Sequence, residues 1–78
     1  MSAEIEIELN GEKTRVPAAL NVAALLQHLA LDAGRVAIEV DRQLVRRPDW
    51  ESRHIHAGAQ VEIVHFVGGG LTRPAHAT

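Results

Sequence analysis

The chain contains no cysteine, and this absence removes disulfide bonds, a thiol nucleophile and thiolate zinc sites from consideration. Aromatic residues are almost as scarce, since Trp50 and Phe66 are the only two. So few rings disfavour the base-stacking platforms of proteins that bind single-stranded nucleic acid. A formal net charge of −2 also disfavours a general nucleic-acid footprint. Nucleic acid is therefore not expected as a partner.

Long apolar runs are also missing. No stretch approaches the length of a membrane span, and the acidic, alternating start "MSAEIEIELN" lacks the basic-then-apolar profile of a signal peptide. A chain of 78 residues accommodates one domain with a small core. We therefore expect a cytoplasmic protein without membrane contact, made of one domain over residues 1–67 and a flexible tail over residues 68–78.

The N-terminal segment predicts a β-hairpin. Apolar and acidic residues alternate strictly from Glu4 to Leu9, which is typical of a half-buried strand. Asn10-Gly11 follows, and this pair favours a two-residue type I′ turn because both positions adopt positive φ. Such a turn fixes the register. The predicted pairs, two of them between opposite charges on the outer face, are Leu9 with Glu12, Glu8 with Lys13, Ile7 with Thr14, Glu6 with Arg15 and Ile5 with Val16.

One amphipathic helix is predicted from Val22 to Ala30. Its apolar side chains recur at the helical i, i+3, i+4, i+7 spacing, and Asn21 precedes them as a suitable N-cap. Because this is the one segment of the chain with a helical period, the helix is expected to cover a sheet built from the remaining elements.

Three further strands are expected after the helix. Val36–Val40 alternates as a strand, Asp41–Gln43 forms a turn, and Leu44–Val45 makes a short strand. A loop with one helical turn covers residues 46–52, and Gln60–Val67 is the last strand. The order β-β-α-β-β-β predicts an α+β fold: a mixed sheet of about five strands with one helix packed on one face. The first and last strands are the best candidates for a central parallel pair.

Catalytic constellations are not recognisable in the sequence. No hydroxyl residue stands in a known arrangement with a histidine and an orienting carboxylate. No glycine-rich loop joins a strand to a helix, so a phosphate cradle has no support. Glu4, Glu6 and Glu8 are interpreted as a solvated strand face rather than as catalytic carboxylates. These residues by themselves therefore indicate no enzymatic reaction.

Two polar clusters carry alternative interpretations. His54 and His56 would lie on one side of an extended segment, as half of a metal site. Surface histidines around a turn are the simpler interpretation, so no metal is predicted. Four arginines near Trp50 form either a solvated loop or a docking surface for an acidic partner. These are Arg42, Arg46, Arg47 and Arg53.

The end of the last strand is the best candidate for a partner-binding surface. If Val61 and Ile63 face the helix, Val64 and Phe66 project from the opposite face of the sheet. Together with Val67 they would contact a partner, unless a loop or a neighbouring side chain covers them.

Three glycines, Gly68, Gly69 and Gly70, follow this strand. A segment without side chains can thread a channel too narrow for any Cβ and can place a terminal carboxylate against a reagent. By itself the triplet fits a plain linker equally well.

The ordered set of these segments resembles the β-grasp sulfur-carrier proteins, and most closely the ThiS family of thiamine biosynthesis. The resemblance is carried by order and spacing, since no single piece is specific. The segments are "LNGE" at 9–12, "NVAALLQHL" at 21–29, "VAIEVDRQLVRRPDW" at 36–50 and "GAQVEIVHFVGGG" at 58–70. The resemblance implies a ubiquitin-like β-grasp fold.

The same resemblance implies that the chain is a protein cosubstrate and not an enzyme, and that it binds no cofactor itself. The missing catalytic constellations fit this implication. An E1-like enzyme would adenylate the carboxylate of Gly70 with ATP. The adenylate would become a thiocarboxylate, with sulfur that comes from cysteine through a desulfurase. Thiazole synthase would then take the sulfur, while Gly68, Gly69 and Gly70 thread the partner's active site.

Members of the resembled family usually end at Gly-Gly, whereas Gly70 is joined here to Leu71. Three alternatives follow. A protease removes Leu71–Thr78, the chain end is misassigned, or the chain is a ubiquitin-like interaction module without sulfur chemistry. Within sulfur chemistry, a carrier of the type of the molybdopterin synthase small subunit is the other candidate, and "RRPDW" favours the thiamine branch.

Overall fold

The computed structural model describes residues 3–66 and 72–74 of the chain. These residues form six strands, one α-helix and two short 3-10 helices. The predicted order of five strands and one helix is confirmed, and β6 is an additional strand. In chain order the elements are β1 (Glu4–Leu9), β2 (Glu12–Pro17), α1 (Val22–His28), η1 (Ala33–Arg35), β3 (Val36–Val40), β4 (Gln43–Val45), η2 (Arg47–Asp49), β5 (Gln60–Phe66) and β6 (Thr72–Pro74).

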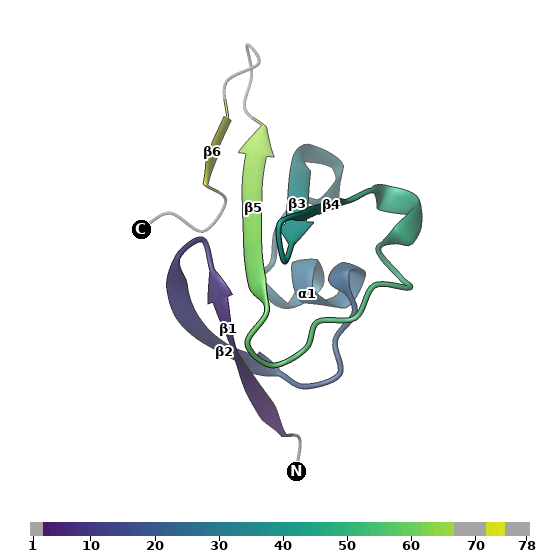
Figure 1. Ribbon diagram of the computed structural model, residues 1–78. Coiled ribbons are helices and arrows are strands. Elements are labelled where there is room, and N and C mark those ends of the chain that lie inside the picture. The colour runs from purple at the N-terminus through teal and green to yellow at the C-terminus, as the bar shows by residue number, and fades with distance from the viewer. Residues whose placement is uncertain (1–2, 67–71, 75–78) are drawn as a thin grey trace.

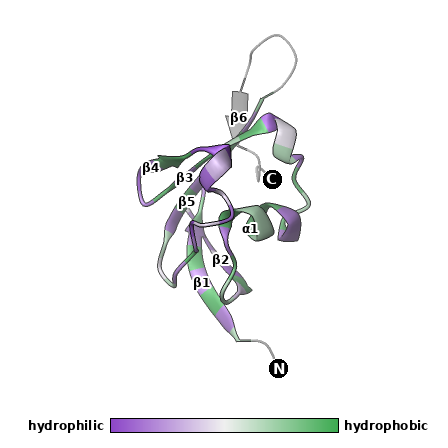
Figure 2. Cartoon of the chain, turned by 90° about the vertical axis from the view of Figure 1, so that its right-hand side faces the viewer, coloured by the Kyte–Doolittle hydropathy of each residue, from purple (hydrophilic) through white to green (hydrophobic). Residues whose placement is uncertain are grey.

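The strands form one mixed sheet in the order β2-β1-β5-β3-β4, and β6 lies beside β5 (Figure 1). The central strands β1 and β5 run parallel, as predicted, and the other pairs are antiparallel. Helix α1 lies on one side of the sheet (Figure 2). In the part of the chain that the structure describes, no helix is long and apolar enough to cross a membrane.

The hairpin of β1 and β2 has the predicted register at all five pairs. Asn10 and Gly11 have φ values of 51° and 83°, as a type I′ turn requires. One ion pair differs from the expectation. The Nε atom of Arg15 lies 3.4 Å from the Glu4 carboxylate, although Glu6 is its direct neighbour in register. Long side chains reach such diagonal neighbours on the same face of a sheet.

Helix α1 begins as predicted, because the side-chain oxygen of Asn21 accepts a hydrogen bond of 2.8 Å from the Ala24 N–H. It ends at His28, two residues earlier than predicted. Ala30 has a φ of 58°, which no helix residue can adopt. The N–H groups of Ala30 and Leu31 donate back into the last turn at 3.0 and 3.1 Å, and this Schellman arrangement closes the helix.

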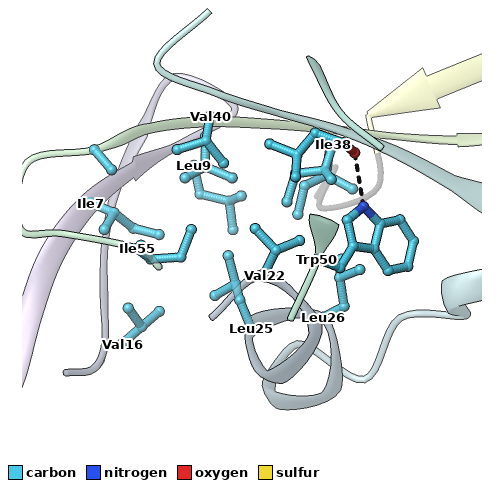
Figure 3. Packing of buried hydrophobic residues seen from close by; sticks show 14 of the residues in the cluster. Ile7, Leu9, Val16, Val22, Leu25, Leu26, Ile38, Val40, Trp50 and Ile55 are labelled. Carbon is cyan, nitrogen blue, oxygen red and sulfur yellow. Dashed lines mark hydrogen bonds between the residues drawn. The ribbon is translucent and has the colours of Figure 1, made fainter. Parts of the chain in front are cut away.

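The hydrophobic core fills the space between α1 and the inner face of the sheet (Figure 3). Trp50 belongs to it, with 7% of its surface exposed. It lies in the loop of residues 46–52, where the one predicted helical turn is η2. Its indole N–H donates a 2.8 Å hydrogen bond to the Val45 carbonyl, so the ring is buried without an unpaired polar atom. The other core residues are Ile7, Leu9, Val16, Val22, Leu25, Leu26, Val36, Ile38, Val40, Val45, Ile55, Ala59, Val61 and Ile63.

Asn10 has a second role that the sequence pattern did not show. Strand β1 pairs with β5 at two positions, and then it turns away at Asn10. The Asn10 side-chain amide continues the ladder, because its Nδ2 donates to the Ile63 carbonyl at 3.2 Å and its Oδ1 accepts from the Ile63 N–H at 2.9 Å. The side chain therefore takes the place of the next strand residue beside β5.

We predict that Asn10→Gly lowers the free energy of unfolding by about 1–2 kcal/mol, because both backbone groups of Ile63 lose their partner. Glycine keeps the positive φ of the turn, so the loss reports the amide and not turn strain. Urea unfolding of both proteins at neutral pH measures the difference. An unchanged midpoint would show that the amide bridge carries no stability.

Asn10→Asp provides a matched control for the direction of the hydrogen bonds. The carboxylate still accepts from the Ile63 N–H but repels the Ile63 carbonyl at neutral pH. Below about pH 4 the carboxyl group is protonated and can donate again. Its deficit relative to the wild-type chain should therefore shrink in acid, while that of Asn10→Gly should not.

Candidate functional site

The outer face of β5 carries the residues predicted for partner binding. Val61 and Ile63 are buried against the core, whereas Val64 is half-buried and Phe66 is 44% exposed on the opposite face. The predicted placement of these side chains is confirmed. Their role in binding stays a prediction.

The remaining predicted site residues lie outside the described part of the chain. They are Val67 and the three glycines Gly68, Gly69 and Gly70. Their roles are therefore predictions as well.

Leu44 is an additional exposed apolar residue on this face, with 59% of its surface accessible. It stands opposite Glu39 of β3, which stands opposite Glu62 of β5, so all three side chains share the outer face with Phe66. The sequence predicted a three-residue turn, Asp41–Gln43, before Leu44. The structure instead has a two-residue turn, Asp41–Arg42, and Gln43 already pairs with Val40.

Only the correct length of the β3–β4 turn could have located Leu44, and the residues of that turn do not indicate its length. Asp41 and Arg42 have φ values of 53° and 68°, the type I′ values that β-hairpins favour. A two-residue turn places Glu39 opposite Leu44, and Glu39 belongs to the outer-facing set of β3. Neither residue is a glycine or an asparagine, so the sequence did not suggest this turn.

An acidic hollow lies on the outer face of the sheet. Its volume is about 320 Å³, and its charged lining consists of Glu8, Glu39 and Glu62 with Arg42 at the rim of the β3–β4 turn. Glu39 and Glu62 stand directly opposite each other, an arrangement of like charges that destabilises a sheet. The outer face therefore carries two separate exposed apolar side chains and a group of carboxylates whose mutual repulsion a nearby positive charge would reduce.

Two of the four arginines near Trp50 make contacts within the chain. The Arg47 guanidinium stacks on the Trp50 ring at 5.1 Å from its centroid and donates to the Ala33 carbonyl at 2.7 Å. Arg53 donates to the side chain of Gln43 at 3.2 Å. These contacts give both side chains a structural role within the chain. A docking role for the basic residues stays untested.

His56 does not combine with His54 as half of a metal site. Its Nδ1 lies 2.8 Å from the Ala57 carbonyl, and its Nε2 lies 2.7 Å from the Asp41 carboxylate. Each ring nitrogen therefore faces one acceptor, an arrangement that suits the doubly protonated imidazolium. In that form neither nitrogen has a lone pair for a metal. Among the described residues, no three metal-ligating side chains gather closely enough to hold an ion.

The contact of His56 with Asp41 shifts the pKa values of both groups. The Gln60 N–H, which donates to the Asp41 carboxylate at 3.0 Å, and then His56 lower the pKa of Asp41 from its ordinary value of 3.8. The hydrogen bond to Asp41 raises the pKa of His56 from 6.5. The pair thus ties the loop before β5 to the β3–β4 turn at the rim of the acidic hollow.

The arrangement defines a class of protein. A mixed sheet with its first and fifth strands parallel at the centre, and one helix across its inner face, is the ubiquitin-like β-grasp fold. A family model described as the ThiS family matches residues 3–70. Because the match covers most of the chain, the chain belongs to the ThiS family. Residues 71–78 lie beyond the match.

Three known proteins illustrate the similarity. A thiazole synthase from Paramagnetospirillum magneticum is 33% identical over 66 residues, which are 85% of this chain and 20% of that protein. The uncharacterized protein ycf40 of Porphyra purpurea is 33% identical over 70 residues, 90% of this chain and 99% of its own. The crystal structure of the thiamine biosynthesis protein ThiS from Geobacter metallireducens superposes with a TM-score of 0.75 at 29% identity, over 85% of this chain and all of that chain. The chain thus spans a fifth of the thiazole synthase that it matches.

We predict that His56→Gln destabilises the chain more at pH 5.5 than at pH 8.5. A raised pKa means that the folded state binds the proton more tightly, so the contribution is full below pH 6.5 and is lost as the pH rises through the folded-state value. The lowered pKa of Asp41 keeps its carboxylate charged at both pH values. Urea unfolding at the two pH values measures the difference between variant and wild type.

The control for this prediction is the same substitution in an Asp41→Asn background. Without the carboxylate, His56 has lost the partner that raises its pKa, so the extra cost at pH 5.5 should largely disappear. An equal cost of His56→Gln at both pH values in the wild-type background would contradict the prediction.

Proposed function

We propose that the chain is the sulfur carrier of thiamine thiazole formation and acts as a protein cosubstrate in the cytoplasm. The observation that carries the proposal is that the family match ends at Gly70, four residues beyond the exposed end of β5. In the proposed reaction, an E1-like enzyme adenylates the carboxylate of Gly70 with ATP. Sulfur that originates from cysteine through a desulfurase displaces AMP from the adenylate, and a thiol supplies the two electrons that reduce this sulfur to the level of a thiocarboxylate. Thiazole synthase then accepts the sulfur.

The geometry of β5 supports a carrier that delivers its end to another protein. A chain extends by at most about 3.3–3.6 Å per residue, so the four residues from Phe66 to Gly70 reach about 14 Å beyond the strand. The last three of them are glycines, which a narrow channel admits. In this arrangement the folded domain would bind the partner at the mouth of the channel. The glycine segment would carry the reacting group inside the channel.

The outer face of the sheet supports the docking part of the proposal. Leu44 and Phe66 are the large apolar side chains that the described structure leaves exposed, and both lie on this face with the acidic hollow between β1 and β3. Exposed apolar side chains among polar and charged ones are common in protein interfaces. We propose that both the activating enzyme and thiazole synthase bind here.

Thiazole synthase as the acceptor has support from a relative. The protein of that name from Paramagnetospirillum magneticum contains a segment similar to this chain within a polypeptide about five times as long as the matched part. A carrier and the enzyme that consumes its sulfur would gain effective concentration from such a covalent link. The present chain would meet the same enzyme as a separate partner.

The proposal requires a free carboxylate at Gly70, which is joined to Leu71 in this sequence. We propose that a protease removes Leu71–Thr78 before activation. The alternative is an interaction module that uses the same outer face and never forms a thiocarboxylate.

The experiment that separates the two is intact-mass analysis after incubation with the activating enzyme, ATP, desulfurase, cysteine and cell lysate as a protease source. We expect a species that ends at Gly70 with one oxygen replaced by sulfur. Full-length protein that stays unchanged would favour the interaction module. Gly70→Ala should fold normally and give no thiocarboxylate, because a Cβ is added where the reacting carboxyl group must enter the partner.

A second prediction concerns the outer face. Leu44→Asp should weaken binding to the activating enzyme about tenfold or more, because an apolar contact is lost and a carboxylate is buried beside the acidic hollow. Leu44 is exposed, so the fold should persist. Gln27 is also exposed and lies on α1, on the other side of the sheet. Gln27→Asp adds the same charge, so it is the matched control and should bind as the wild type does. Equal affinities of both variants would remove Leu44 from the interface.

A further inference from the structure

On the edge of β5 that faces β1, the backbone groups of successive edge-facing residues are already hydrogen-bonded. The carbonyl of Ala59 accepts from the Glu8 N–H, and that of Val61 accepts from the Asn10 N–H, both at 2.9 Å. Both backbone groups of Ile63 bind the Asn10 amide. Alternate residues of a strand present their backbone groups to the same edge, so His65 comes next on it. No part of β1 extends that far.

Strand β6 occupies this remaining position. It pairs with β5 in antiparallel orientation, with Phe66 opposite Thr72, His65 opposite Arg73 and Val64 opposite Pro74. Because His65 directs its backbone groups to this edge, the pair of His65 and Arg73 is the hydrogen-bonded one. Pro74 lacks an N–H, and it stands at a position whose N–H would point away from β5. The backbone of β6 therefore fits the free edge, and β6 lies beside the C-terminal half of β5 in Figure 1.

We infer that residues 72–74 form a cover strand that holds the carrier in an autoinhibited state. This inference rests on the proposed function, because it concerns the delivery of Gly70. Paired Cα atoms of antiparallel strands lie about 5 Å apart, so Thr72 is held level with Phe66. Gly70 is two residues from Thr72, and it can project only about 7 Å beyond the strand end while β6 is paired. A free segment reaches about 14 Å.

The cover strand has a second consequence for the edge itself. An unpaired strand edge is a template for pairing with another chain. While β6 is in place, the edge at His65 is closed to a strand from any partner. Since β6 holds this edge by one hydrogen-bonded pair of residues, the contact is weak enough to open during processing. Removal of the residues after Gly70 would have two effects in one step. The glycines could extend to their full length, and the strand edge at His65 would be open to a partner.

The test compares Arg73→Pro with Arg73→Ala in the full chain. Proline removes the N–H that faces the His65 carbonyl, whereas alanine keeps the whole backbone and loses only the side chain. We expect amide hydrogen exchange of His65 to be about tenfold faster in Arg73→Pro than in the wild type, and unchanged in Arg73→Ala. The Ile63 amide, which binds Asn10, is the internal reference and should not change. Equal exchange of His65 in all three proteins would overturn the inference.

Limited digestion by proteinase K reads the consequence for the glycine segment. Cleavage between Phe66 and Thr72, followed by intact mass, should be several-fold faster in Arg73→Pro than in Arg73→Ala, because cleavage follows the open population. Faster exchange of His65 without faster cleavage would overturn the autoinhibitory role. These two readouts need no sulfur chemistry. A protected His65 amide with no thiocarboxylate formed in any variant would sink the proposed function alone, and a thiocarboxylate formed with equal exchange would sink the cover strand alone.

Discussion

The short parallel contact between β1 and β5 determines what the rest of the molecule can do. The two strands meet at the centre of the sheet, yet β1 turns back at Asn10 after pairing with Gln60 and Val61. Strand β5 continues to Phe66 with β3 on one side. The position of one two-residue turn therefore leaves the last third of β5 without its central neighbour, and the glycines follow from this projecting end.

The two faces of the sheet divide stability from recognition. The inner face packs against α1 and holds nearly all of the apolar core, with Trp50 closing one side through its bond to Val45. The outer face contributes little to the core and instead exposes Leu44 and Phe66, with Leu44 next to the opposed carboxylates of Glu39 and Glu62. Like charges across two strands cost stability, and a chain with a small core tolerates that cost more readily where a partner compensates it.

Polar side chains provide hydrogen bonds at the places where the strands end. The Asn10 amide replaces a strand residue beside Ile63, and the pair of His56 and Asp41 joins the loop before β5 to the β3–β4 turn. Both contacts fix the surroundings of β5 without adding apolar area. In the proposed carrier the catalytic groups would belong to the partners, and this chain would only have to present its end at a defined place.

Local signals determined much of this fold. The register of the β1–β2 hairpin follows from Asn10-Gly11, the start of α1 from Asn21, and the outward side of Val64 and Phe66 from the alternation of β5, because each depends on neighbours in the sequence. The central parallel pair was also predictable, from the length and apolarity of the first and last strands. The motif order was sufficient to indicate the ThiS family, and the family match bears this out.

Contacts between distant residues were decided by the tertiary structure alone. Asn10 and Ile63 are 53 residues apart, and no local pattern marks an asparagine that completes a remote strand edge. The exposure of Leu44 depended on a turn that contains no glycine or asparagine. The bond of His56 to Asp41 depended on how the loop before β5 packs against that turn. The pairing of β6 required a free edge at His65, which exists because β1 is short. Sequence periodicity sets which side of a strand a residue faces, whereas its neighbours across the sheet depend on how all the strands end.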